Sequence, residues 1–329
     1  MQQPLNRLAA MLVMATAGIG LLGQSALVRA KVSATCPNYL PVATMTGVVD
    51  IPGSDDLADV GQEWNHGIQS FQSDGGINYQ AKATLEVVKN LVDGSTLVGI
   101  TDREFTEEES NAFKSKFGYA PMRFPVCLDA NIVYVNKDNP LTSITMEQLD
   151  AIYSKARLGG GKQPLLHWSD LGVKGNLGKR EINAYSPAAG SAARSSFASL
   201  VMRNGEFRPG IFDKDSSAQI GEAIKADPAG IAYGSLAAWY SANKVIPVVP
   251  YLGAGARFPD QESITSSKYP MPRLFYVYLN RAPGKPLEAN LSEVLHYILS
   301  SEGQNVVADV GIIPGPVAFL TIALKRLDH

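Results

Sequence analysis

The chain has 329 residues, of which 45% are hydrophobic and 18% are charged, and its formal net charge is −2. This composition is typical of a globular protein that is long enough to form two domains. Because the sequence contains no basic stripe, recognition of nucleic acid or of an anionic membrane through a strong positive field is excluded. Any binding of anions must therefore come from local geometry.

The chain begins with a segment typical of a secretory signal. Arg7 precedes an apolar run from Leu8 to Leu22, which is short for a membrane span and has the length of a signal-peptide core. Small-residue cleavage sites follow at Val28-Arg29-Ala30 and at Val32-Ser33-Ala34. We expect residues 1–30 to be a cleaved signal peptide and the protein to be periplasmic or secreted. A retained N-terminal anchor helix is the alternative.

The first half of the remaining chain alternates strands with amphipathic helices. A strand rich in β-branched residues is expected at 44–51, followed by a helix with apolar residues at steps of three and four from Leu57 to Phe71. Thr106 and Glu109 form a capping-box pattern that opens a helix burying Phe113 and Phe117. The other elements expected in this half are a strand at 77–79, a helix at 81–92 and a strand at 96–100. This alternation predicts parallel sheets flanked by helices.

A second unit of the same kind begins at Asn131. Its expected elements are strands at 131–136, 182–185, 230–236 and 245–251, and helices at 146–153 and 220–226. The glycine loop Gly159-Gly160-Gly161 is not expected to cradle phosphate, because no helix with Lys-Ser/Thr follows it. A strand at 274–279, a helix at 287–299 and a tail at 309–316 end the chain. Two α/β lobes result, and a ligand is expected in the cleft at the carboxyl ends of their strands.

Three segments place small hydrogen-bonding residues where a helix is expected to start. They are Gly53-Ser54-Asp55-Asp56-Leu57, Thr101-Asp102-Arg103 and Ala189-Gly190-Ser191-Ala192-Ala193. A helix start exposes unpaired backbone N–H groups and the positive end of the helix dipole, which attract anions. Three such starts that converge on one cleft could hold a small oxyanion without a metal.

The cysteines and histidines indicate no metal site. Cys36 and Cys127 form an even pair, which in an exported protein is compatible with a disulfide and equally compatible with two separate buried thiols. The four histidines are scattered and have no metal-ligand spacing. We therefore expect no metal and no cofactor.

Several segments in order along the chain carry a resemblance to a known family. They are Gly53-Ser54-Asp55-Asp56-Leu57 with Trp64 and Phe71, Gly99-Ile100-Thr101-Asp102-Arg103, Val133-Tyr134-Val135-Asn136-Lys137, Trp168-Ser169-Asp170-Leu171-Gly172, Gly230-Ile231-Ala232-Tyr233-Gly234, and Tyr269-Pro270-Met271-Pro272-Arg273-Leu274-Phe275-Tyr276-Val277-Tyr278. In this order and spacing the chain resembles the periplasmic phosphate-binding proteins of ABC importers, the PstS-like branch of the type II periplasmic-binding-protein fold.

The resemblance implies a two-lobed α/β fold in which each lobe is a mostly parallel sheet flanked by helices, with the ligand cleft between the lobes. Lobe I is expected to comprise residues 31–127 and 250–329, and lobe II residues 128–249. The implied protein is a monomer that is not an enzyme, and its partners are phosphate or a similar oxyanion and the membrane subunits of an ABC importer.

The resemblance also implies a set of ligand-binding residues. They are Ser54, Asp55, Thr101, Asp102, Arg103, Gly190, Ser191 and Ala192. Asp102 can accept a hydrogen bond only from a ligand that carries a proton, so it would distinguish protonated phosphate from sulfate. The alternative for Asp102 is a helix N-cap. Arg103 can make a charge-assisted contact with the anion, or else a salt bridge within the protein.

The third segment departs from the family pattern of Arg, three residues and Ser-Gly-Thr. Pro187 stands where the arginine belongs and Ala193 where the threonine belongs. A hydrogen bond to a charged group contributes roughly 1.5–3 kcal/mol, so its loss weakens binding by one or two orders of magnitude. Arg103 or Arg194 could compensate. A stand-alone scavenger, sensor or secreted accessory protein is therefore an open alternative, whereas a phosphatase-like enzyme is disfavoured because no histidine lies near the three segments.

Overall fold

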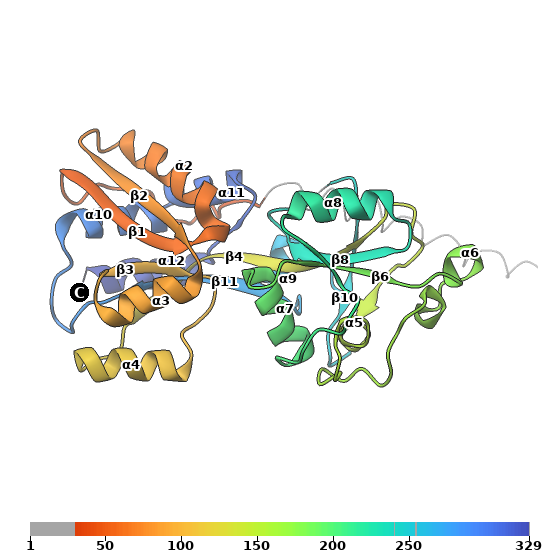
Figure 1. Cartoon of the computed structure of the whole chain (residues 1–329). Helices are drawn as coiled ribbons and strands as arrows, with labels where there is room; N and C mark the ends of the chain where they lie inside the picture. The colour runs from red at the N-terminus through yellow and green to blue at the C-terminus, as the bar shows by residue number, and fades with distance from the viewer. Residues whose placement is uncertain (1–29, 240, 254, 329) are drawn as a thin grey trace, which may run out of the picture.

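The computed structural model describes residues 30–239, 241–253 and 255–328, which form two α/β lobes side by side (Figure 1). Apart from Ala30, the expected signal peptide at residues 1–30 lies outside the described residues. Within the described part of the chain, no helix has both the length and the apolar character that crossing a membrane requires.

The first lobe is built on one β-sheet with helices packed around it. Three of its strands are parallel, namely β1 (Gly47–Ser54), β2 (Gly75–Lys82) and β3 (Val98–Thr101). The antiparallel strands are β11 (Pro272–Leu279), β4 (Met122–Val135) and β12 (Ile313–Pro314), which pairs with β4. The helices around this sheet are η1 (Asp55–Leu57), α2 (Ala58–Gln69), α3 (Thr84–Asp93), α4 (Glu107–Phe117), α10 (Ala289–Leu299), α11 (Ser301–Asp309) and α12 (Val317–Leu327).

The second lobe continues the same sheet through the C-terminal half of β4. Its strands are β8 (Gly230–Ser235), β6 (Asn183–Pro187), β7 (Phe212–Lys214) and β9 (Lys244–Ile246), with β5 (Ile144–Thr145) and β10 (Val248–Val249) as a separate pair. Its helices are α5 (Met146–Tyr153), η2 (Trp168–Leu171), α6 (Gly175–Gly178), α7 (Ala192–Met202), α8 (Ser217–Ala226) and α9 (Gln261–Thr265).

Two antiparallel strands, β4 and β11, connect the lobes and set where functional residues meet. β4 pairs with β11 in the first lobe and with β8 in the second, and Arg273 of β11 lies opposite Asp129 of β4. The parallel strands of both lobes run toward this junction: Thr101 at the end of β3 pairs with β11, and Ser235 at the end of β8 pairs with Asn131 of β4. The carboxyl ends of the strands therefore face one another, as predicted.

The core contacts of residues 264–271 place the second boundary between the lobes later in the chain than expected. Ile264, Tyr269 and Met271 belong to the hydrophobic core of the second lobe, which also contains Trp168. The return to the first lobe, expected at residue 250, comes instead where β11 starts at Pro272. The expected strand at 245–251 suggested a return to the first lobe, but β10 is only two residues long and the chain turns back into the second lobe after it.

Several local predictions are confirmed and others are wrong. The helix at 146–153 and the capping box of Thr106 are confirmed, whereas α11 and α12 were not predicted. Phe71, expected on the buried face of α2, is 47% exposed and lies beyond the end of the helix. Cys36 and Cys127 are two separate buried thiols, so the structure contains no disulfide between them.

Candidate functional site

The first predicted segment places a buried hydroxyl group at the end of β1. Ser54 precedes the short helix η1 and is fully buried, and its Oγ has no hydrogen-bond partner among the described residues. Its carbonyl accepts a hydrogen bond of 2.8 Å from the Tyr79 hydroxyl. Gly53 permits this contact, because a Cβ there would lie 2.2 Å from the Tyr79 hydroxyl oxygen. The backbone of Ser54 is therefore fixed, whereas its hydroxyl has no partner among the described residues.

The second predicted segment is a strand end and not a helix start. β3 ends at Thr101, and α4 begins only at Glu107 after a loop. The Thr101 hydroxyl donates to the carbonyl of Arg103 at 2.7 Å, and the Arg103 guanidinium contacts both carboxylate oxygens of Glu109 at 2.8 Å. The hydrogen bond from Arg103 lowers the pKa of Glu109 below its ordinary value. Thr101 and Arg103 are thus engaged within the same stretch of chain, whereas the partners of Asp102 come from α3 and β11.

A residue that sequence reasoning missed orients Asp102. Thr84 opens α3, directly after β2, and its hydroxyl donates to Asp102 Oδ1, while the backbone N–H of Asp102 donates to Thr84 Oγ1 at 3.3 Å. The sequence placed the start of this helix at Ala81, so Thr84 was counted in its interior. The available signal was a threonine near the start of an expected helix, since threonine favours helix starts over helix interiors.

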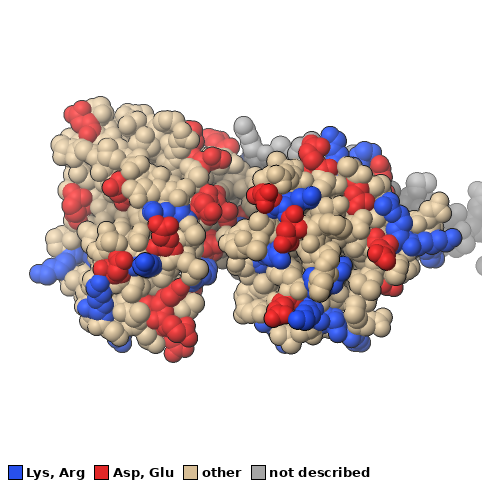
Figure 2. Space-filling view, viewed as in Figure 1, with Lys and Arg blue, Asp and Glu red and all other residues tan. Residues whose placement is uncertain are grey.

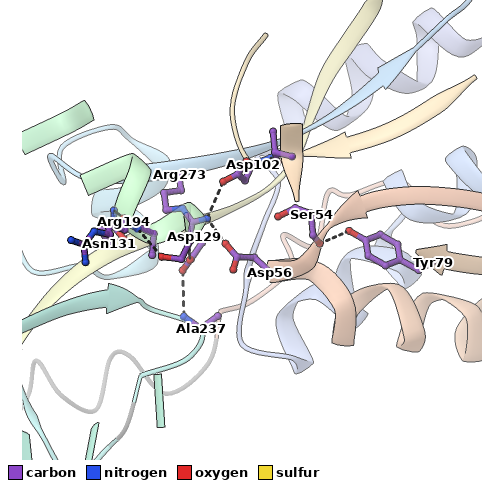
Figure 3. A network of polar contacts seen from close by, with 12 residues as sticks. Ser54, Asp56, Tyr79, Asp102, Asp129, Asn131, Arg194, Ala237 and Arg273 are labelled. Carbon is purple, nitrogen blue, oxygen red and sulfur yellow. Dashed lines mark hydrogen bonds and ion pairs between the residues drawn. The ribbon is translucent and has the colours of Figure 1, made fainter. Parts of the chain in front are cut away.

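A buried arginine at the junction of the lobes is the second missed residue. Arg273 contacts Asp56 of η1, Asp102 at 3.4 Å and Asp129 at 3.2 Å, so it gathers carboxylates from three elements (Figure 3). Burial would lower the pKa of Arg273, but the neighbouring Asp56 and Asp129 raise it above its ordinary value. Burial also raises the pKa of Asp129, and Arg273 offsets this only in part. The signal was an arginine in an otherwise apolar strand, Pro272–Leu279.

The third predicted segment is a helix start in the second lobe, as expected. Ser191 caps α7 and accepts a hydrogen bond of 3.3 Å from the N–H of Arg194, after Gly190 with a φ of +87°. Ala192 is the first residue of the helix. Asn131 Nδ2 donates to the Ala193 carbonyl at 3.1 Å, which ties α7 to the connecting strand β4. The helix start is therefore held next to the junction that carries Asp129 and Arg273.

Arg194 places its guanidinium beside Pro187, the position at which the family pattern has an arginine. The Arg194 guanidinium donates to the Pro187 carbonyl and to Ser186 Oγ, both at 2.9 Å, and forms an ion pair with Asp213. It also lies 4.1 Å from the centre of the Phe207 ring. A guanidinium thus occupies the end of β6, although it already has a protein carboxylate as its partner.

The surroundings of the first-lobe segments are acidic. Figure 2 shows a furrow between the lobes with acidic side chains along its first-lobe side. Asp55 is among the exposed residues, and desolvation, followed by the charge of the neighbouring Asp56, raises its pKa. Within the described residues, no group of three or more His, Cys, Asp and Glu side chains is placed to hold a metal ion. The groups available to a ligand are therefore hydroxyl groups, backbone N–H groups, carboxylates and guanidinium groups.

Comparison with known proteins gives a consistent set of relatives. Residues 43–302 match the model of a family described as the PBP superfamily domain. The phosphate-binding protein PstS of Pseudomonas aeruginosa is 31% identical over 323 residues, which cover 98% of this chain and 99% of that protein. The protein SphX of Synechococcus elongatus is 24% identical over 243 residues, which cover 72% of this chain and 68% of that protein.

Solved structures share the fold. An ABC-type phosphate transport receptor from Vibrio cholerae superposes with a TM-score of 0.65 at 19% identity and covers 80% of this chain and 99% of its own. PstS from Borrelia burgdorferi superposes with a TM-score of 0.61 at 19% identity and covers 82% of this chain and 99% of its own. At these identities the likeness establishes the two-lobed architecture.

Proposed function

Because the chain belongs to the PBP superfamily, we propose that it is an exported solute-binding protein that captures inorganic phosphate, or a related tetrahedral oxyanion, between its lobes. In this proposal the protein is a periplasmic monomer that delivers its ligand to the membrane subunits of an ABC importer. Its relatives support this assignment, since they are phosphate-binding and phosphate-transport proteins.

One observation carries the choice of ligand: a free hydroxyl donor and an oriented carboxylate acceptor lie at neighbouring strand ends. Ser54 Oγ is buried without a partner among the described residues, and Thr84 fixes one oxygen of Asp102. The hydroxyl end of Ser54 points toward the side where Asp102 and Arg273 meet (Figure 3). Such a site offers a donor to an anionic oxygen and an acceptor to a P–OH group, and it disfavours an anion that carries no proton.

The second lobe completes the proposed site from the opposite side. The start of α7 supplies backbone N–H groups and the positive end of a helix of 11 residues. Ser191 caps this helix, and Asn131 ties its first turn to β4. Bending of the two connecting strands would bring this helix start toward Ser54 and Asp102 and enclose the anion, which is the hinge closure that two-lobed proteins use.

Calorimetric titration of residues 31–329 with phosphate, arsenate and sulfate tests the proposal. We expect phosphate and arsenate to bind with a Kd below ~1 μM and sulfate to bind far more weakly. Asp102→Asn should weaken phosphate binding by about 10- to 100-fold, whereas Asp138→Asn, at an exposed aspartate in the second lobe, should leave it unchanged. Absence of phosphate binding, or turnover of an aryl phosphate by the purified chain, would contradict the proposal.

A further inference from the structure

We propose that Arg273 is the cationic ligand of the bound anion and that Asp56 competes with the anion for it. This inference rests on the proposed function, because it assigns a role at the same site. It answers the question that Pro187 raises, namely which residue supplies the positive charge that the family pattern places at that position.

The Arg273 side chain is held in a fixed position before any anion binds. Its side chain is only 1% exposed, and the paired strands β4 and β11 set it opposite Asp129, which is equally buried. Nη1 faces Asp129, Nη2 faces Asp56 and Asp102, and Nε has no partner among the described residues. A guanidinium has five N–H donors, so it can hold Asp129 and still bind an anion.

The other arginines near the site are engaged elsewhere. Arg103 makes a two-point contact with Glu109, which also belongs to the capping box of α4. Arg194 is paired with Asp213 and donates to the backbone at the end of β6. Arg273, by contrast, contacts Asp102, the residue expected to receive the proton of the ligand. An oxyanion bound between Ser54 and Asp102 therefore meets the Arg273 guanidinium.

The three carboxylates around Arg273 differ in whether a bound anion can replace them as partners of the guanidinium. Asp129 is buried and also accepts a hydrogen bond of 3.3 Å from the N–H of Ala237, and Asp102 is held by Thr84. Asp56 is 33% exposed and lies on the three-residue helix η1, so its carboxylate can turn into water. Three carboxylates facing one guanidinium leave a local excess of negative charge that opposes a second anion. Release of Asp56 relieves this excess, and Asp56 therefore acts as a competitor built into the site.

Calorimetric titration with inorganic phosphate at pH 7.5 tests this assignment in five forms of residues 31–329. These are the wild type, Asp56→Asn, Arg273→Gln, the double variant Arg273→Gln with Asp129→Asn, and Arg180→Gln. Arg180 pairs with Asp227 at 3.4 Å in the second lobe and serves as the matched control. The double variant removes both members of the most buried of these ion pairs, so Asp129 is not left without its partner if Arg273→Gln alone fails to fold.

We expect Asp56→Asn to lower the Kd for phosphate by about 3- to 10-fold, since the competitor is removed. Arg273→Gln, and the folded double variant, should raise the Kd by about 10- to 100-fold, while Arg180→Gln should not change it. Unchanged binding by the Arg273 variants, or weaker binding by Asp56→Asn, would overturn the inference while leaving the proposed function intact. If the wild type binds no phosphate, the proposed function fails and the inference fails with it.

Discussion

Replacing Tyr79 with phenylalanine removes the hydroxyl group that holds the backbone of Ser54. This hydroxyl donates to the Ser54 carbonyl at 2.8 Å. The Tyr79 ring lies against Gly53 and Gly61, where a Cβ would come within 2.5 and 2.1 Å of the ring atoms. The ring keeps its place in the variant, so the change is confined to one hydrogen bond. Such a bond contributes about 1 kcal/mol net to the free energy of unfolding.

We therefore expect Tyr79→Phe to lower the melting temperature by about 2–4 °C and the free energy of unfolding by about 1 kcal/mol. Because Ser54 is then less firmly placed, the Kd for phosphate should rise by about 3- to 10-fold. Tyr251→Phe is the matched control: its hydroxyl donates to the Val201 carbonyl at 2.7 Å in the second lobe, so it should lower stability similarly without changing the Kd. Equal Kd values for Tyr79→Phe and Tyr251→Phe would refute the positioning role of Tyr79.

Three further predictions concern stability and the cysteines. Burial raises the pKa of Tyr276 and of Tyr297 to about 12, whereas tyrosines in the unfolded chain ionise near 10. The free energy of unfolding should therefore fall as the pH rises from about 10 to 12. Urea denaturation at several pH values, followed together with tyrosinate absorbance, checks this, and a free energy of unfolding that does not change with pH would contradict it. Glu293→Ala removes a buried carboxylate that accepts hydrogen bonds from two backbone N–H groups and a tyrosine hydroxyl. It should lower the free energy of unfolding, measured by urea denaturation, by about 3 kcal/mol, and a loss below about 1 kcal/mol would contradict these contacts. Cys36 and Cys127 should both alkylate without reductant, but only after unfolding, and mass spectrometry showing no label on the unfolded, unreduced chain would indicate a disulfide.

Features that depend on neighbours in sequence were predictable. The capping box of Thr106 and Glu109 joins residues three apart, and the cap of α7 by Ser191 joins it to Arg194, also three residues away. Both follow from side chains that reach the first turn of their own helix. The alternation of short strands and helices likewise indicated two α/β lobes.

Features that depend on sheet register were not predictable from one sequence. Asp102 meets Thr84 because β2 and β3 end at the same edge, and it meets Arg273, 171 residues away, because β11 runs antiparallel beside β3. Nothing in the local pattern around residue 273 indicates which carboxylates it will contact. Asp102 could therefore be predicted as a candidate ligand residue, whereas its contacts with Thr84 and Arg273 could not.

Arg103 illustrates why the choice between two local interpretations needed the structure. Its spacing allowed either a ligand contact or a salt bridge, and Glu109 lies six residues further on. Because α4 begins only at Glu107, Glu109 falls in its first turn and the loop folds Arg103 back onto it. A helix start at residue 102 would instead have directed the segment at the ligand.

In the proposed function, phosphate binds between the lobes, on the strand ends that carry Ser54 and Asp102. The most direct test is a crystal structure of residues 31–329 grown with phosphate at saturating concentration. We predict tetrahedral density within hydrogen-bond distance of Ser54 Oγ and Asp102, with the start of α7 facing it from the second lobe. Phosphate bound elsewhere on the molecule, with Ser54 and Asp102 untouched, would contradict the claim.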